Sequence, residues 1–140
     1  MREPRPVRFE RAFQIQPADI DDLGHVNNVV YLRWVQEVAA AHWRFAAPQE
    51  LQAEVVWVVL RHEIDYKRPA LPGDHVIART WVGEATGTRF ERHVEIVRAP
   101  DHQVLARARS VWCPLSARTG RPQRIDASLH DRFYEPDDSS

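Results

Sequence analysis

The sequence predicts an α+β fold in which a curled antiparallel sheet of about five strands surrounds one long central helix. Residues 29–45 are apolar nearly all round, with a narrow polar stripe, and this pattern is typical of a helix enclosed by other elements. One strand-like segment precedes this helix, and four follow it. Because a single buried helix needs cover on several sides, we expect the sheet to wrap around it.

Length and composition are those of one globular domain. The 140 residues, 44% hydrophobic and 28% charged, predict a single domain over residues 1–140 with flexible ends at 1–6 and 135–140. The formal net charge of -1 does not favour a nucleic-acid partner. One cysteine, Cys113, excludes an internal disulfide and a multi-cysteine metal site. With no secretory signal and no apolar run that could span a bilayer, we expect no membrane contact and a cytoplasmic location.

The first two elements follow from local patterns. Residues 7–16 alternate loosely between apolar and polar side chains and predict a strand, which Pro17 ends. The helix comes next, with Asn27 or Asn28 as its N-cap and Pro48 as its stop signal. Its strongly polar positions are Arg33, Gln36, Glu37, His42 and Arg44.

The rest of the chain reads as strands joined by turns. The predicted segments are strands at residues 54–68, 75–84, 88–98 and 103–115, and a short helix at residues 126–133. Residues 85–87 are a plausible hairpin connection. In the strand that follows it, Phe90, Val94 and Ile96 share an apolar face, and Arg92 is the exception on that face.

The densest group of polar residues comes immediately before the helix. A helix start offers free backbone N–H groups and the positive end of the helix dipole. A carboxylate beside such an electrophilic site is the minimal arrangement of a hydrolytic centre. Hydrogen bonds that stabilise the turn are the alternative explanation for these carboxylates. The group consists of Asp19, Asp21, Asp22, His25, Asn27 and Asn28.

Two stretches of the chain resemble a known family, the hotdog-fold acyl-CoA thioesterases of the 4-hydroxybenzoyl-CoA thioesterase type. The resemblance implies a hotdog fold and hydrolysis of an acyl-CoA thioester to free acid and CoA. It also implies no cofactor and an acyl group held in a tunnel beside the helix. Because one sheet around one helix leaves its edge strands exposed, we expect edge-to-edge or face-to-face pairing into a homodimer or homotetramer. The stretches are Asp19-x-Asp21-x-x-Gly24-His25-Val26-Asn27-Asn28-x-x-Tyr31-x-x-Trp34 and Asp65-Tyr66-x-x-Pro69-Ala70-x-x-Gly73-Asp74.

The same resemblance assigns roles to individual residues. It implies that Asp21 is the catalytic carboxylate and that the backbone N–H of Asn28 polarises the thioester carbonyl. Plant acyl-ACP thioesterases have a similar turn, and His25 matches their histidine, but Leu23 replaces their asparagine. Another branch carries a catalytic glutamate on the helix, which makes Glu37 the alternative base.

Further residues are candidates for contacts with the substrate. Asn27, Tyr31 and Trp34 follow the motif into the helix, where capping and core packing are the structural alternatives. Lys67 and Arg68 are candidates for the CoA phosphates, and a solvated charged face is the alternative.

The sequence predicts no metal site. The nearest candidate group is His62, Glu63 and Asp65, and alternation along a strand points neighbouring side chains to opposite faces.

The expected reaction needs an activated nucleophile and a site for the oxyanion. Asp21 can attack the carbonyl or act as general base on a water, and the sequence leaves both open. The leaving thiol has a pKa of about 8.5 and departs as a thiolate without an obligatory acid. Two alternatives to acyl-CoA hydrolysis are an acyl-ACP thioesterase and a non-catalytic acyl-binding hotdog protein.

Overall fold

The long helix α1 (Asn28–Ala46) begins and ends where the local signals predict. Asn27 is extended, at φ -60° and ψ 139°, and its side-chain oxygen accepts a hydrogen bond from the Val29 N–H at 3.1 Å. At the other end the Ala47 N–H donates to the Trp43 carbonyl, and Pro48 follows. The predicted cap and stop are therefore confirmed.

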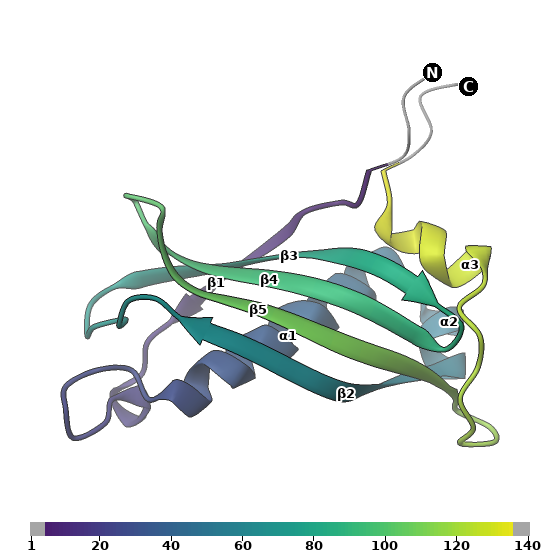
Figure 1. Cartoon of the computed structure of the whole chain (residues 1–140), viewed down its shortest axis with the longest axis horizontal. Coiled ribbons are helices and arrows are strands. Elements are labelled where there is room, and N and C mark those ends of the chain that lie inside the picture. Colours follow the sequence, from purple (N-terminus) through teal and green to yellow (C-terminus); the bar gives the residue numbers. More distant parts are fainter. Residues whose placement is uncertain (1–4, 136–140) are drawn as a thin grey trace.

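An antiparallel sheet of five strands curls around this helix, as Figure 1 shows. The strand order is β1-β3-β4-β5-β2, so the strand that follows the helix lies at one edge and the N-terminal strand at the other. In this computed structural model, which describes residues 5–135, the predicted fold class is confirmed. The strands are β1 (Phe9–Gln14), β2 (Val55–Tyr66), β3 (His75–Thr86), β4 (Arg89–Ala99) and β5 (Gln103–Ser116).

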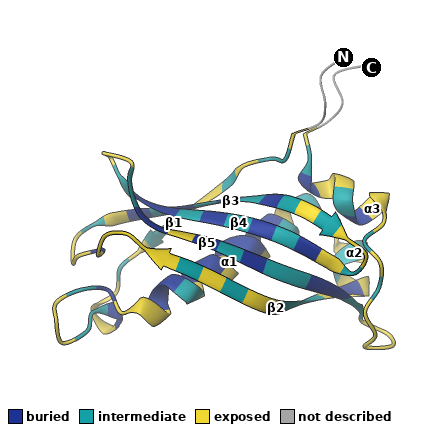
Figure 2. Cartoon of the chain, viewed as in Figure 1, coloured by how far each residue is buried: buried dark blue, intermediate teal, exposed yellow. Residues whose placement is uncertain are grey.

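The core lies between α1 and the concave face of the sheet. Figure 2 shows buried and partly exposed residues alternating along β3 and β4, as expected for strands with one covered face. Trp34, Val35 and Val38 of α1 are each at most 1% exposed. They belong to one cluster with residues of β3, β4 and β5, so one face of the helix is buried against the sheet. The opposite face is exposed in the single chain, with Val29 67% and Phe45 73% exposed, so the predicted enclosure on nearly all sides is wrong for the single chain.

The observed elements differ from the predicted ones in two places. A short helix, α2 (Gln49–Glu54), directly precedes β2, where the sequence analysis expected no helix. The C-terminal helix is split into α3 (Ala127–His130) and the 3-10 turn η2 (Asp131–Phe133). Asp126 caps α3 by accepting from the Leu129 N–H at 3.1 Å.

The two ends of the described chain lie together. The Val7 N–H donates to the Phe133 carbonyl, and the Glu135 N–H donates to the Arg5 carbonyl, both at 2.8 Å. Of the ends predicted to be flexible, residues 1–4 and 136–140 lie outside the described residues. Within residues 5–135, no helix has the length and apolar character needed to cross a membrane.

Candidate active site

The turn before α1 presents the Asp21 carboxylate in a fixed position. Its Oδ1 accepts hydrogen bonds from the backbone N–H groups of Leu23 at 2.9 Å and His25 at 3.2 Å. The Asp21 N–H donates to the His25 carbonyl at 2.8 Å, which closes the turn. Among the described residues, none donates to Oδ2. One oxygen therefore anchors the side chain, and the other is open to a ligand.

Asp19 has a structural role. It is 4% exposed, and its carboxylate accepts from Arg33 Nη2 at 3.0 Å and from the Gln16 N–H at 2.9 Å. The Gln16 contact belongs to a capping box around the 3-10 turn η1 (Pro17–Asp19). Asp22, in contrast, is exposed. Asp19 is therefore held inside the turn by its own contacts, whereas Asp21 keeps one carboxylate oxygen without a donor among the described residues.

The first turn of α1 supplies an open hydrogen-bond donor. The Val29 N–H is used by the Asn27 side chain, and the Val30 N–H donates to the Asn27 carbonyl at 2.9 Å. The Asn28 N–H finds no acceptor in the part of the chain that the structure describes. It lies at the positive end of a 19-residue helix, where an anion or a polarised carbonyl is favoured.

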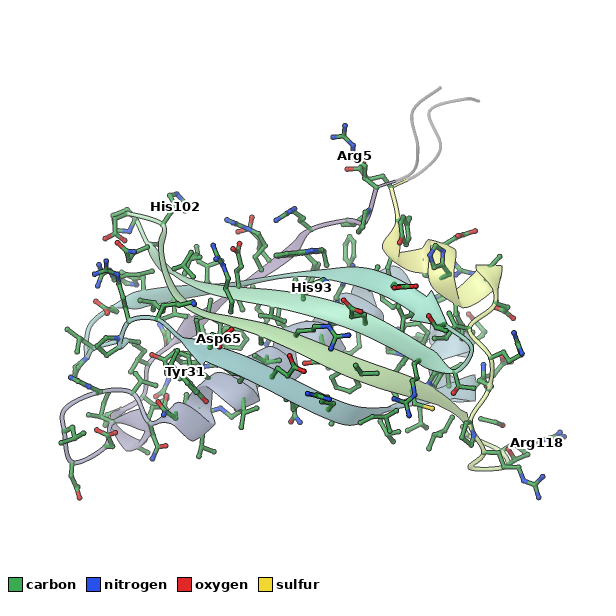
Figure 3. The ribbon with its side chains drawn as sticks, in the orientation of Figure 1. Arg5, Tyr31, Asp65, His93, His102 and Arg118 are labelled. Atoms are coloured by element: carbon green, nitrogen blue, oxygen red, sulfur yellow. The ribbon has the colours of Figure 1, made fainter. Side chains whose placement is uncertain are left out.

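Tyrosines fix this helix start against the end of β2 and the segment that follows it. The Tyr66 hydroxyl donates to the Asn28 carbonyl at 3.1 Å. The Tyr31 hydroxyl accepts from the Ala70 N–H at 2.8 Å, and the Ala70 carbonyl accepts from the Val26 N–H at 2.9 Å. Tyr31, labelled in Figure 3, thus lies where the start of α1 meets the sheet. The motif residues around 65–74 and 19–34 are therefore neighbours in space.

The predicted substrate contacts divide by exposure. Tyr31 and Trp34 are 2% and 1% exposed, and burial raises the pKa of the Tyr31 hydroxyl. In this structure both side chains pack in the core, and their contact with a substrate stays a prediction. Lys67 and Arg68 are exposed. They directly follow Tyr66, whose hydroxyl contacts the Asn28 carbonyl, so the backbone of both residues lies beside the helix start. Asn27 is exposed as the cap of α1.

The two remaining catalytic candidates, His25 and Glu37, differ in their distance from the Asp21 turn. His25 is in the Asp21 turn, and its ring has no hydrogen-bond partner within residues 5–135. Glu37 is nine residues after Asn28, about 14 Å along the helix axis. Its carboxylate lies 3.8 Å from Arg33 Nε. The structure therefore brings His25 to the Asp21 turn, and leaves Glu37 outside it.

The described residues contain no group of three or more histidine, cysteine or acidic side chains that could hold a metal ion. His62 instead lies within hydrogen-bond distance of Ser110, with Nδ1 and Oγ 2.6 Å apart, and of Gln36 of α1. Burial lowers the pKa of His62. Its neighbour Glu63 turns to Arg61 and Arg109.

A second polar centre lies near the other end of α1. The Arg92 guanidinium, 6% exposed, donates from Nη1 to His42 Nδ1 at 2.9 Å and to Thr80 Oγ1 at 3.0 Å. Burial, and then the charge of Arg92, lowers the pKa of His42 to about 3, so the imidazole is neutral and can accept. Burial lowers the pKa of Arg92 to about 9.

This centre is not predicted by the sequence pattern. His42 was placed in the polar stripe of the helix, which is wrong: the residue is 1% exposed and stacks on Phe9 at 5.0 Å between ring centroids. The signal that could have found the centre is Arg92, the charged residue on the apolar face of its strand. A charge at such a position implies a buried polar partner or a ligand.

Known proteins with similar sequences indicate one family. A family model described as the thioesterase-like superfamily matches residues 15–133. The chloroplastic acyl-(acyl-carrier-protein) hydrolase FATB3 of Cuphea viscosissima is 30% identical over 128 aligned positions, and the match covers 85% of this chain and 31% of that protein. The chain spans about a third of the length of the curated relatives it matches.

Solved structures agree with the predicted hotdog fold. A 1,4-dihydroxy-2-naphthoyl-CoA thioesterase from Synechocystis superposes with a TM-score of 0.77 at 21% identity, covering 91% of this chain and 96% of that one. A 4-hydroxybenzoyl-CoA thioesterase complexed with 4-hydroxybenzoyl-CoA gives a TM-score of 0.80 at 15% identity, covering 90% and 98%. At these identities the likeness shows the fold.

The neutral His42 predicts a specific loss of stability in acid. Its folded pKa of about 3 lies below the ordinary value of 6.5. Below about pH 6.5 the unfolded chain therefore takes up a proton that the folded chain does not bind until about pH 3. Between about pH 6.5 and about pH 3, the titration of His42 therefore lowers the free energy of unfolding by about 1.4 kcal/mol for each unit by which the pH falls.

Urea unfolding of the wild type and of His42→Gln at pH 7.5 and 5.0 measures this loss. The glutamine oxygen can still accept from Arg92 and does not titrate. We expect the wild type to lose about 2 kcal/mol more than the variant between these pH values. Equal losses in the two proteins would contradict a buried neutral histidine.

Proposed function

We propose that this chain, which belongs to the thioesterase-like superfamily, hydrolyses acyl-CoA thioesters to the free acid and CoA. One observation carries the proposal. An anchored carboxylate with a free oxygen, Asp21, lies in the turn that leads into a helix whose first N–H, on Asn28, is open. A carboxylate beside an oriented donor supplies what thioester hydrolysis needs.

The Asn28 N–H is the proposed donor to the thioester carbonyl. As negative charge develops on the carbonyl oxygen, a donor already aimed at it stabilises the transition state without reorganising. The partial positive charge of the α1 N-terminus adds to this effect. The Tyr66 contact with the Asn28 carbonyl holds the same residue in place, through its next peptide group.

Asp21 is the proposed catalytic carboxylate. Through Oδ2 it can attack the thioester carbon to form a mixed anhydride, or it can take a proton from an attacking water. In both routes the thiolate of CoA leaves, and one water is consumed to give the free acid. His25 and Asn27, in the same turn, are proposed to border the bound thioester.

The carrier of the acyl group is proposed to be CoA. Lys67 and Arg68 are exposed beside the helix start, where the phosphates of a CoA bound at Asn28 can reach them. The cytoplasmic location expected from the sequence belongs to the same proposal. The second candidate is acyl-ACP hydrolysis, because the curated relatives are acyl-ACP hydrolases. Rates with palmitoyl-CoA and palmitoyl-ACP, compared at equal concentration, decide between the carriers.

A homodimer through the edge strand β2 is the proposed assembly. The outer strand β2 has a free hydrogen-bonding edge and carries exposed apolar residues, with Val56 48%, Leu60 50% and Tyr66 43% exposed. On β4, in contrast, Glu91 and Glu95 form ion pairs with arginines of β5. A charged sheet face favours edge pairing over the face-to-face contact of a homotetramer.

Removing the charge of Asp21 is expected to stop turnover without disturbing the fold. In Asp21→Asn the amide oxygen still accepts from the Leu23 and His25 N–H groups, but it is neither a nucleophile nor a base. Steady-state thiol release from an acyl-CoA panel should fall by about 10²–10⁴. Asp22→Asn, one residue further in the same turn, is the control and should keep wild-type rates. Full activity in Asp21→Asn would refute the assignment and make Glu37→Gln the next variant.

The role of the Asn28 N–H can be tested by proline. Proline lacks the N–H and is favoured at the first position of a helix, and the extended Asn27 suits a residue that precedes proline. We expect Asn28→Pro to keep its helix content and lose about 10²–10³ in kcat, the usual loss for one oxyanion donor. The control Asn28→Ala keeps the N–H and should keep the rate. Similar rates in the two variants would contradict the proposed donor.

The assembly is tested by light scattering after size exclusion. The wild type should elute with twice the mass of one chain, and Leu60→Lys, which places a charge on the β2 edge, should shift it to the monomer. Leu71→Lys is the control, since Leu71 is 39% exposed but lies outside β2. A monomeric wild type, or a dimer that survives Leu60→Lys, would contradict this interface.

A further inference from the structure

A cavity of about 310 Å³ lies between the second half of α1 and the sheet. Its aromatic wall consists of Trp43, Trp57, Phe90, Trp112 and Phe133. The exposed residues Ala40 and Val56 also line it, so it opens to the surface between α1 and β2. The nearest helix residue that lines it is 11 positions after Asn28, about 17 Å along the axis. It therefore shares no residue with the proposed hydrolytic centre.

One buried cation lies in the wall of this cavity. Arg92 lines it, is 94% buried, and uses only Nη1 for its hydrogen bonds to His42 and Thr80. Its Nε and Nη2 have no acceptor among residues 5–135. Arginine carries five N–H donors in a planar fork that matches a carboxylate. The guanidinium therefore has unused donors at a cavity whose other lining residues are apolar or aromatic, apart from Glu91.

The tryptophans of the wall add unused donors. The indole N–H groups of Trp57 and Trp112 are buried and have no partner within the described chain. A buried donor without an acceptor destabilises the folded state, and few remain in a native protein. Because two such indoles and Arg92 line the same cavity, the missing partner is an acceptor.

No carboxylate of the described residues forms an ion pair with Arg92. Glu91, the neighbour on β4, pairs instead with Arg109 at 2.9 Å and His93 at 3.2 Å. Besides its hydrogen bonds to His42 and Thr80, the guanidinium has a cation–π contact with the Phe133 ring, whose centroid lies 5.1 Å from the guanidinium carbon. A buried, unpaired cation is costly, and an anion in the cavity would relieve that cost.

We propose that this cavity binds a small apolar molecule bearing a carboxylate, with the carboxylate on Arg92 and the apolar body against the aromatic wall. The volume is at the low end for ligand sites, which suits a medium-chain or single-ring acid. The carboxylate has two sources, a free acid or the far end of a dicarboxylic acyl group. The site goes beyond the proposed hydrolysis, and binding of a free acid does not depend on it.

Calorimetric titration of the protein as isolated tests the site with octanoate and 3-phenylpropanoate. The matched neutral probes are octanamide and 3-phenylpropanamide, which keep the shape and lose the charge. We expect one acid per chain, bound at least about 10-fold more tightly than its amide. Equal affinity of acid and amide, or no binding of either acid, would overturn the proposal.

Two variants locate the binding. Arg92→Met should weaken octanoate about 10- to 100-fold and bring it to the level of the amide. Ala39→Leu narrows the cavity from α1 and keeps the Arg92 side chain, and should abolish binding of both probes in a folded protein. A preference for the acid that survives either variant would place the carboxylate elsewhere and refute the site.

Kinetics distinguish the two sources. This kinetic experiment rests on the proposed hydrolysis. It compares the rates of hydrolysis of hexadecanedioyl-CoA and hexadecanoyl-CoA. A distal carboxylate on Arg92 predicts a kcat/KM at least about 10-fold higher for the dicarboxylic substrate, lost in Arg92→Met. Equal kcat/KM values, together with tight octanoate binding, assign the site to a free acid. Absence of hydrolysis would contradict the proposed function and leave the titration unaffected.

Discussion

The fixed start of α1 is the constraint on which the rest of the site depends. The Asn27 N–H donates to the Asp19 carbonyl at 2.8 Å, and the Tyr66 hydroxyl donates to the Asn28 carbonyl at 3.1 Å. The first joins the helix to the Asp21 turn, and the second joins it to the end of β2. Since both partners are themselves held by the sheet or the core, the open N–H keeps one direction. Such preorganisation is the main means by which a donor lowers a reaction barrier.

Near each end of α1 there is a hydrogen-bond donor without an acceptor in the described chain, and the two donors differ in their burial. At the first turn a backbone donor stays near the surface, where water or a substrate can satisfy it. Toward the last turns, Arg92 is enclosed by apolar side chains and relies on the neutral His42 and on Thr80. Because water can satisfy the first donor, leaving it without a protein acceptor costs little free energy, and a substrate can bind to it transiently. The second carries a desolvation cost that only a bound partner of opposite charge would remove.

The sequence predicted the architecture because periodicity reports burial directly. The long central helix, the Asn27 cap and five strands all followed from local patterns, and the Asp21 turn followed from its residues. Strand order did not, since pairing of β1 with β3 depends on contacts distant in sequence. The place of His42 was missed because the helix is apolar nearly all round in sequence, so the pattern does not separate its buried face from its exposed face. Arg92 interrupts the apolar face of its strand in the sequence, but only the structure shows that it lines a cavity.

The central claim is that the Asn28 N–H polarises the thioester carbonyl. Infrared difference spectroscopy on Asp21→Asn, with an acyl-CoA carrying ¹³C at the thioester carbonyl, measures this polarisation in a bound, unreacted substrate. A hydrogen bond from a helix start weakens the C=O bond, so the account predicts a carbonyl band at lower frequency than in water. The shift should disappear when Asn28→Pro is added. A bound substrate with an unshifted band, or a shift that survives the proline, would contradict the account.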